Sequence, residues 1–166
     1  TVSSGLQSFA TRYAYANGAY DPVEREFRGF GRVIVNDPEG NLQEHRFHQD
    51  ANRAGKPYRQ EVKNAAGTLF SRTQNTWTCA TPAPGVTFCS LAQTDTLTFD
   101  GDTTLKQTRT AFLYDSYGNE TQHREEGEPT VAGDERTIRT RYTVNPSIWL
   151  VDRVARRVTL DASGTR

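Results

Sequence analysis

The sequence of 166 residues contains no methionine, two cysteines, two tryptophans and three lysines among its twenty basic side chains. The twenty basic and twenty acidic residues cancel, so no net field attracts nucleic acid or an anionic membrane. No apolar run approaches the length that spans a bilayer, and the first residues lack the charged and then apolar layout of a signal peptide. The composition therefore predicts neither nucleic acid nor membrane as a partner.

Apolar residues are also scarce. Their share is about 38% when Gly is counted and Tyr is omitted, against roughly 45–50% in ordinary globular domains. The 22 threonines, with the aromatic and β-branched residues, favour pleated structure over disorder. We expect an all-β chain whose sheet has one thin apolar face and needs more protein against it. Cut out of a longer parent chain, the sheet should dimerise edge to edge, aggregate, or hide its edges with charged residues such as Arg139 and Arg141.

The length fits one domain, and the absence of methionine from position one predicts a piece of a longer protein. We expect a single all-β segment over residues 1–166. Within it, residues 1–19 would be a loosely ordered lead-in with a turn at Asn17-Gly18, and residues 20–166 would be hairpin repeats.

Four turns of one chemistry interrupt the chain. Each begins with Asp or Asn, which bonds its own backbone, and has Gly three residues later for the left-handed position. Each Gly precedes Asn or Thr, and the uneven spacing favours hairpins of variable length over a solenoid. The predicted turn residues are Asp37 and Gly40, Asn64 and Gly67, Asp115 and Gly118, and Asp161 and Gly164.

Strand-like runs lie between the turns, and no segment shows a sustained helical period with caps. The prolines of residues 81–85 argue against strand there, and the acidic stretch 125–134 is expected to be a loop. In residues 94–99 the alternation places Asp95, Leu97 and Phe99 on one face and threonines on the other. The predicted strands cover residues 33–35, 42–48, 58–63, 68–72, 76–79, 86–91, 94–99, 105–114, 136–144, 147–151 and 154–160.

Four motifs stand out in the sequence: the run YDPVEREFRGFGRV from Tyr20, YDSYGN from Tyr114, GDERT from Gly133 and SIWLV from Ser147. They resemble motifs of YD-repeat (RHS) proteins, and more closely those of the B component of insecticidal toxin complexes and its Salmonella virulence-plasmid-type relatives. YDSYGN is similar to the YDxxGN repeat core, and GDERT and SIWLV resemble the segments that follow that core. The resemblance covers most of the chain, from about residue 13 to the end, although the first two turns depart from the repeat pattern.

This resemblance implies antiparallel β-hairpins that form a curved, open sheet, as a segment of a hollow shell enclosing a toxic C-terminal polypeptide. The implied partners are the rest of the parent shell, the enclosed toxin and other toxin-complex subunits. The implied location is secreted or at the bacterial cell surface. The toxic domain and the self-cleaving protease region would lie outside these 166 residues.

The two cysteines offer a cross-link. If a hairpin turns about Pro84, Cys79 and Cys89 lie opposite each other, with α-carbons roughly 4.5 Å apart at a non-hydrogen-bonded position. The alternatives are a disulfide, which would stabilise the fold by about 2–3 kcal/mol, and two small buried thiols. We favour the disulfide because the parent is expected to be exported.

Catalytic and ligand-binding chemistry is not predicted. His45 and His48, with Glu44 and Asp50, form the best metal candidate, but on a strand the two histidines point to opposite faces. No nucleophile elbow, phosphate loop or CxxC motif is present. We predict no enzyme activity, no cofactor and no metal site.

A second function is open. Five aromatic residues could form a face on which a stand-alone β-module binds carbohydrate or protein, or they could cover the thin core. They are Trp77, Tyr114, Tyr117, Tyr142 and Trp149.

Overall fold

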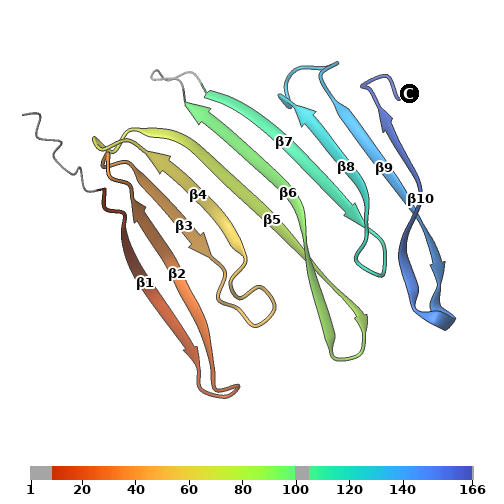
Figure 1. Ribbon diagram of the computed structural model, residues 1–166, viewed down its shortest axis with the longest axis horizontal. Coiled ribbons are helices and arrows are strands. Elements are labelled where there is room, and N and C mark those ends of the chain that lie inside the picture. The colour runs from red at the N-terminus through yellow and green to blue at the C-terminus, as the bar shows by residue number, and fades with distance from the viewer. Residues whose placement is uncertain (1–8, 100–104, 166) are drawn as a thin grey trace, which may run out of the picture.

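The computed structural model describes residues 9–99 and 105–165. In this part, 10 strands form one antiparallel sheet whose order follows the sequence (Figure 1). The only helical element in these residues is a 3-10 turn, η1, so the all-β prediction is confirmed. The strands are β1 (Arg12–Asp21), β2 (Glu26–Asn36), β3 (Leu42–Phe47), β4 (Pro57–Lys63), β5 (Leu69–Ala83), β6 (Val86–Phe99), β7 (Leu105–Tyr114), β8 (Glu120–Gly127), β9 (Arg136–Asn145) and β10 (Leu150–Leu160), and η1 is Pro146–Ile148.

The sheet is a single open layer. In the described part of the chain each strand pairs only with its neighbours in sequence, so β1 and β10 are the two edges of the sheet. The chain exposes 11570 Å², well above the roughly 8,200 Å² expected for a compact monomer of 18.6 kDa. Among the described residues, Cys89 is the only buried hydrophobic side chain. The predicted open sheet is confirmed, and it has no core of its own.

The four glycine turns share one geometry. At the first turn the Asp37 carboxylate accepts a hydrogen bond from the Asn41 N–H at 2.7 Å, and the Gly40 N–H donates to the Asp37 carbonyl at 3.1 Å. Gly40 has φ 87°, a left-handed conformation in which Gly is unstrained. The other three turns repeat these bonds, with the Asn64 amide oxygen as the side-chain acceptor in the second turn, and have glycine φ values of 84°, 86° and 78°.

The turns do not share a position in the sheet. The turns after β2, β4 and β10 lie at one end of the strands, whereas the turn between β7 and β8 lies at the opposite end (Figure 1). The internal repeat is therefore one of turn chemistry and not of placement.

Several strands are longer than the sequence predicts. The predicted strands 68–72 and 76–79 merge into β5, and 86–91 and 94–99 merge into β6. The prediction that residues 81–85 exclude strand was wrong for 81–83. Pro82 lies where the register shifts between Ala80 and Ala83, so its missing N–H interrupts no regular pairing.

Other local predictions also need correction. Asn17-Gly18 is not a turn: Asn17 has φ 55° inside β1, and the register with β2 shifts just beyond it. The irregularity is therefore a bulge within an ordered strand. β8 continues to Gly127, into the predicted acidic loop, because β9 pairs with it as far as Glu125 and β7 as far as Gly127. Residues 147 and 148 belong to η1 and not to a strand.

Three hairpins extend past the strands beside them and point to the same end of the sheet (Figure 1). In β1–β2, β3 pairs with β2 only from Arg32 to Asn36. In the β5–β6 hairpin, β4 pairs with β5 only up to Gln74, and β7 pairs with β6 only from Gln93 onward. In β9–β10, β8 pairs with β9 only up to Arg139. We call the projecting parts the first arm (residues 17–31), the second arm (75–92) and the third arm (140–157).

None of the described residues forms a helix with the length and apolarity needed to cross a lipid bilayer.

Candidate functional site

Charged side chains line one face of the sheet. The register sets Glu44 of β3 opposite Glu61 of β4, and Glu61 opposite Arg72 of β5. Two residues further along β3, Arg46 pairs with Arg59 of β4 on the same side of the sheet. Because directly opposed residues project to the same side, the alternating charges of these short strands converge. We call this side the charged face.

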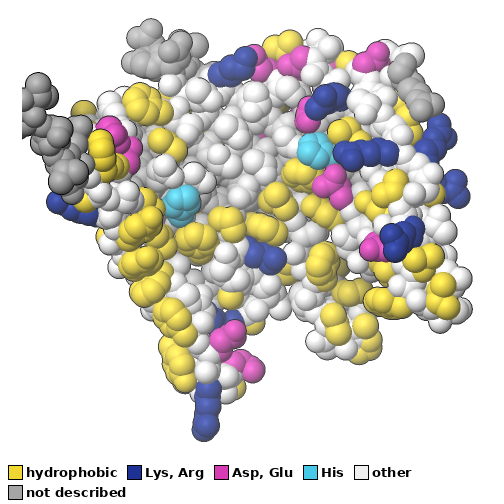
Figure 2. Space-filling view, in the orientation of Figure 1, with side chains coloured by type: hydrophobic (Ala, Val, Ile, Leu, Met, Phe, Trp, Pro, Cys, Tyr) yellow, Lys and Arg dark blue, Asp and Glu magenta, His cyan; other side chains and the backbone are white. Residues whose placement is uncertain are grey.

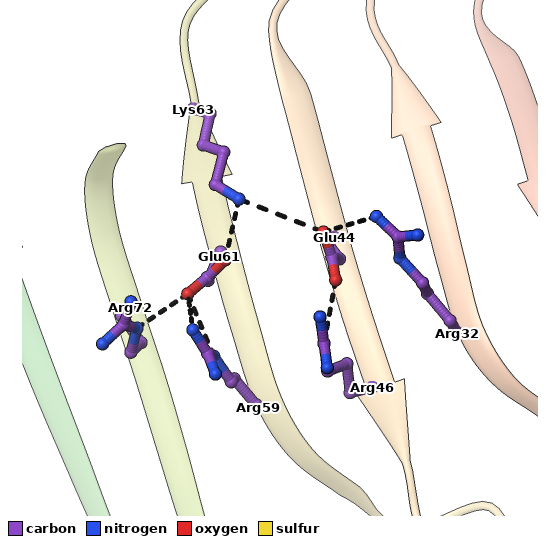
Figure 3. Close-up of polar contacts among 7 residues, drawn as sticks. All are labelled: Arg32, Glu44, Arg46, Arg59, Glu61, Lys63 and Arg72. Carbon is purple, nitrogen blue, oxygen red and sulfur yellow. Dashed lines mark hydrogen bonds and ion pairs between the residues drawn. The ribbon is translucent and has the colours of Figure 1, made fainter. Parts of the chain in front are cut away.

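Two glutamates are the buried polar residues of this face, with 8% of Glu44 and 4% of Glu61 exposed. Glu44 accepts hydrogen bonds from Arg32 Nη2 at 2.9 Å and from Arg46 Nε at 2.8 Å (Figure 3). Lys63 Nζ lies 4.0 Å from Glu44 and 2.9 Å from Glu61, so it links the two carboxylates.

Glu61 is also held by three cations, and Lys63 lies closer to it than to Glu44. Arg72 Nε donates to Glu61 at 2.7 Å, and Arg59 donates through Nε and Nη2 (Figure 3). Burial raises the pKa of Glu61, but the hydrogen bonds from Lys63, Arg59 and Arg72 outweigh it and lower the pKa from 4.5 to about 2. The carboxylate therefore stays ionised across the physiological range.

Asp95 of β6 continues this arrangement. It accepts from Arg109 Nε at 2.8 Å, from Gln107 Nε2 at 2.9 Å and from Gln93 Nε2 at 2.6 Å. Burial raises the pKa of Asp95, and these donors lower it below its usual range. A carboxylate that is always ionised and fully hydrogen-bonded is a poor proton donor or acceptor at neutral pH. The charged face is thus built for cohesion and not for acid–base chemistry.

The opposite face carries threonines. Thr73, Thr96 and Thr108 are opposed in turn across β5, β6 and β7, and Thr94 is opposed to Thr110. Figure 2 looks onto this side and shows a broad area without charge over these strands. The predicted alternation of residues 94–99 agrees with this register, but the expected continuous apolar face does not form in the described sheet.

The fold separates the two histidines of the metal candidate, although His48 Nδ1 lies 3.8 Å from Asp50 Oδ2. His45 pairs with Val33 and is adjacent to Glu44 on β3, so its side chain projects away from the charged face that holds Glu44. His48 lies beyond the end of β3, with its ring 5.0 Å from that of Tyr58. No group of three or more potential ligands suited to a metal ion occurs among the described residues.

The two cysteines are bonded across the second arm. Their Sγ atoms lie 2.00 Å apart and their α-carbons 4.0 Å apart. The neighbouring strands do not reach this part of the arm, so the bond cross-links a hairpin that has no lateral strand beside it.

The five aromatic residues do not form one face. Trp77 donates from Nε1 to the Pro57 carbonyl at 2.9 Å, and Lys56 Nζ lies 4.5 Å from the centre of its ring. Tyr142 donates to the Glu120 carbonyl at 3.1 Å. Tyr117 and Trp149 do come together, with ring centres 6.4 Å apart where the β7–β8 turn meets the tip of the third arm.

A polar hollow of about 410 Å³ lies where the β3–β4 loop meets the second arm, lined among others by His48, Tyr58, Trp77 and Asp95. The acid in it, Asp95, is already hydrogen-bonded to three side chains. The only acid among the described residues of the lining is therefore engaged within the sheet.

Arg139 and Arg141 do not guard an edge as expected, since β9 lies between β8 and β10. The prediction from the sequence did not identify β10 as the edge strand or its arginines as edge residues. It also missed that Glu44 and Glu61 are buried, which depends on how four strands align.

Comparisons with known proteins agree with the fold. Residues 1–61 match the family model described as the insecticide toxin TcdB middle/N-terminal region. No curated protein matches the chain.

Solved structures of toxin complexes match nearly the whole chain. The crystal structure of TcdB2-TccC3-Cdc42 has a TM-score of 0.70 and 14% identity over 95% of this chain and 13% of that chain. A structure of the Photorhabdus luminescens Tc holotoxin pore has a TM-score of 0.70 and 12% identity over 92% of this chain and 12% of that chain. For TcdB2-TccC3 the TM-score is 0.66, with 14% identity, 95% coverage of this chain and 13% of that chain.

The chain therefore spans about an eighth of the length of the chains it matches. At these identities the structural matches show the fold. Together with the family-model match, they confirm the resemblance to the B component of insecticidal toxin complexes.

Proposed function

We propose that this chain is a structural segment of a toxin-complex protein like the B component, and that it forms one strip of a β-sheet wall. In this proposal residues 1–166 belong to a longer polypeptide, whose wall encloses a toxic C-terminal polypeptide until delivery. The observation that carries it is the single-layer sheet with two open edges, which aligns over 92–95% of its length with a small part of much longer toxin-complex chains.

The physical state of the sheet supports a wall. A free-standing domain of this size usually buries two packed layers around a core, and here one hydrophobic residue is buried in the described part. The sheet is instead held by ladder hydrogen bonds, by the ion pairs of Glu44 and Glu61, and by the cross-linked second arm. The faces carry charged residues and threonines, and they also expose large apolar side chains such as Phe27, Leu113 and Trp149, which suits a layer that meets protein as well as solvent.

A catalytic role has little support. The carboxylates of the charged face are neutralised by arginine and lysine, and their lowered pKa values remove them from proton transfer. We propose that the segment has no catalytic, cofactor or metal site of its own. Its partners would be the remainder of the wall, the enclosed polypeptide and other toxin-complex subunits.

The disulfide supports an exported location, since such bonds persist in oxidising surroundings. We therefore place the parent outside the bacterial cytoplasm, as a secreted or surface protein.

The test uses the full-length parent, expressed from the gene that contains this segment. Its C-terminal polypeptide should resist a protease that digests the same polypeptide rapidly when it is expressed alone. In the parent, Glu61→Ala should open the wall and speed digestion, whereas Glu125→Ala should leave the protection unchanged because Glu125 forms an exposed pair with Arg136. A wild-type parent whose C-terminal polypeptide is digested as fast as the free form would contradict the proposal.

A further inference from the structure

Four exposed arginines gather on the third arm and at its base without acidic partners. In the part of the chain that the structure describes, none of them forms an ion pair, whereas Arg32, Arg46, Arg59, Arg72 and Arg109 all do. We call these four the arginine stripe: Arg139, Arg141, Arg153 and Arg156.

The register places the stripe on one side of the sheet. Arg141 of β9 and Arg156 of β10 are directly opposed, and Arg153 is opposed to Thr143, two residues beyond Arg141. Arg139 is two residues before Arg141 and projects the same way. Like charges in directly opposed positions destabilise a strand pair, so this arrangement needs a compensating anion.

The same face shows how the sheet meets that need elsewhere. Ala111 of β7 lies on the charged face and pairs with Arg124 of β8, which in turn pairs with Thr137 of β9. Thr137 is two residues before Arg139, so the stripe lies on the same side of the sheet as the two buried glutamates. There, Glu61 lies between Arg59 on its own strand and Arg72 on the next. At the stripe, β8 and β9 supply no such carboxylate, and within residues 9–99 and 105–165 β10 has no further strand beside it.

The outer edge of β10 can accept a strand. From Arg156 to Leu160 it pairs residue by residue with β9, so one side of an extended backbone is bonded and the other is free. β1, the other edge, carries Tyr13 and Tyr15 but no cluster of arginines. The two edges thus suit different neighbours.

We infer that the free edge of β10 binds an extended peptide segment with Asp or Glu at alternate positions, which adds to the sheet as a further strand. Backbone hydrogen bonds to β10 supply the docking, and the carboxylates on one side of the added strand meet Arg141 and Arg156. The inference rests on the proposed function, since a wall gives β10 a neighbour, and it specifies the chemistry of that neighbour.

The experiment uses the 166-residue chain and a fluorescent octapeptide in which glutamate alternates with valine or threonine. Binding is followed by fluorescence anisotropy at about 150 mM salt, where long-range charge effects are screened. The double variant Arg141→Gln/Arg156→Gln should bind the peptide at least about 10-fold more weakly. The matched control is Arg157→Gln on the same strand, because Arg157 is opposed to Thr140 and projects to the other side; it should change the affinity less than about 3-fold.

Two further probes separate strand addition from simple attraction to charge. The same peptide with glutamine for glutamate, and the glutamate peptide N-methylated at alternate amides, should each bind at least about 10-fold more weakly. The double variant should melt at the same temperature as wild type or higher, because it removes opposed like charges, so lost binding would not reflect unfolding.

Equal binding of the N-methylated peptide, or equal binding of the glutamate peptide by wild type and the double variant, would overturn the inference. So would a heparin fragment that displaces the peptide while N-methylation has no effect, since the stripe would then be a general polyanion site. The protease experiment on the parent uses neither the peptide nor the stripe, so each proposal can fail without the other.

Discussion

Replacing Glu61 by Gln tests whether ion pairs on the charged face take the place of a core. The substitution keeps the shape of the side chain and leaves Arg59, Lys63 and Arg72 around a neutral amide. The Glu61 side chain is 5% exposed, and its pKa of about 2 lies below its ordinary 4.5. That difference corresponds to at most about 3 kcal/mol of stability at neutral pH.

Two features of the structure reduce this ceiling. The sheet is one layer thick, so solvent lies close to the pair, and the three cationic side chains are 28–31% exposed and can regain hydration. We expect Glu61→Gln to lower the free energy of unfolding by about 1–3 kcal/mol at pH 7.

The pH dependence has a definite sign. The pKa of Glu61 is lower in the folded than in the unfolded chain, so its contribution is present above about pH 4.5 and is lost as the pH falls toward 2. Wild type and Glu61→Gln should therefore differ most at pH 7 and converge between those values.

Urea denaturation followed by tryptophan fluorescence measures both effects. The control is Glu125→Gln, whose pair with Arg136 spans 2.8 Å, close to the 2.7 Å between Arg72 and Glu61, but joins side chains that are 40% and 55% exposed. It should cost less than about 0.5 kcal/mol. The reasoning is refuted if Glu61→Gln unfolds within about 0.5 kcal/mol of wild type at pH 7, or if the difference remains unchanged at pH 3.

Further predictions concern the second arm and the turns. Unreduced, unfolded protein should show no reactive thiol, and Cys79→Ser/Cys89→Ser should lose about 2–3 kcal/mol; two titratable thiols would show the pair to be unbonded. Gly118→Ala should destabilise more than Gly164→Ala, because both have positive φ but a Cβ at Gly118 would lie 3.1 Å from the Phe88 ring. Calorimetric melting temperatures would measure the difference, and equal losses in the two variants would mean that this contact carries no cost.

Local chemistry made the turns and the strand type predictable. The Asp37-to-Gly40 turn depends on one carboxylate and one left-handed glycine, both visible in the sequence. The alternation of residues 94–99 predicted the correct faces of β6, because the alternation of side chains along a strand is also a local property. The lengths of β5 and β6 were not predictable, because Pro82 reads as a strand breaker unless the irregular pairing beside it is known.

The features that matter most for the site depend on register. Glu44 and Glu61 are ordinary polar residues in the sequence, and they become buried because β2 to β5 align arginines and a lysine around them. The arginine stripe needs the same information, since Arg141 and Arg156 meet only when β9 and β10 pair with a bulge between them. A pattern along one strand does not give its alignment with the next.

Hydrogen exchange at the two sheet edges tests the wall most directly, comparing the 166-residue chain with the full-length parent. The wall requires that the outward amides of β1 and β10 exchange quickly in the isolated chain while β3 and β4 are protected, and that both edges become protected in the parent. Fast exchange at both edges in the parent would contradict the account, because these strands would then have no neighbours to complete a wall.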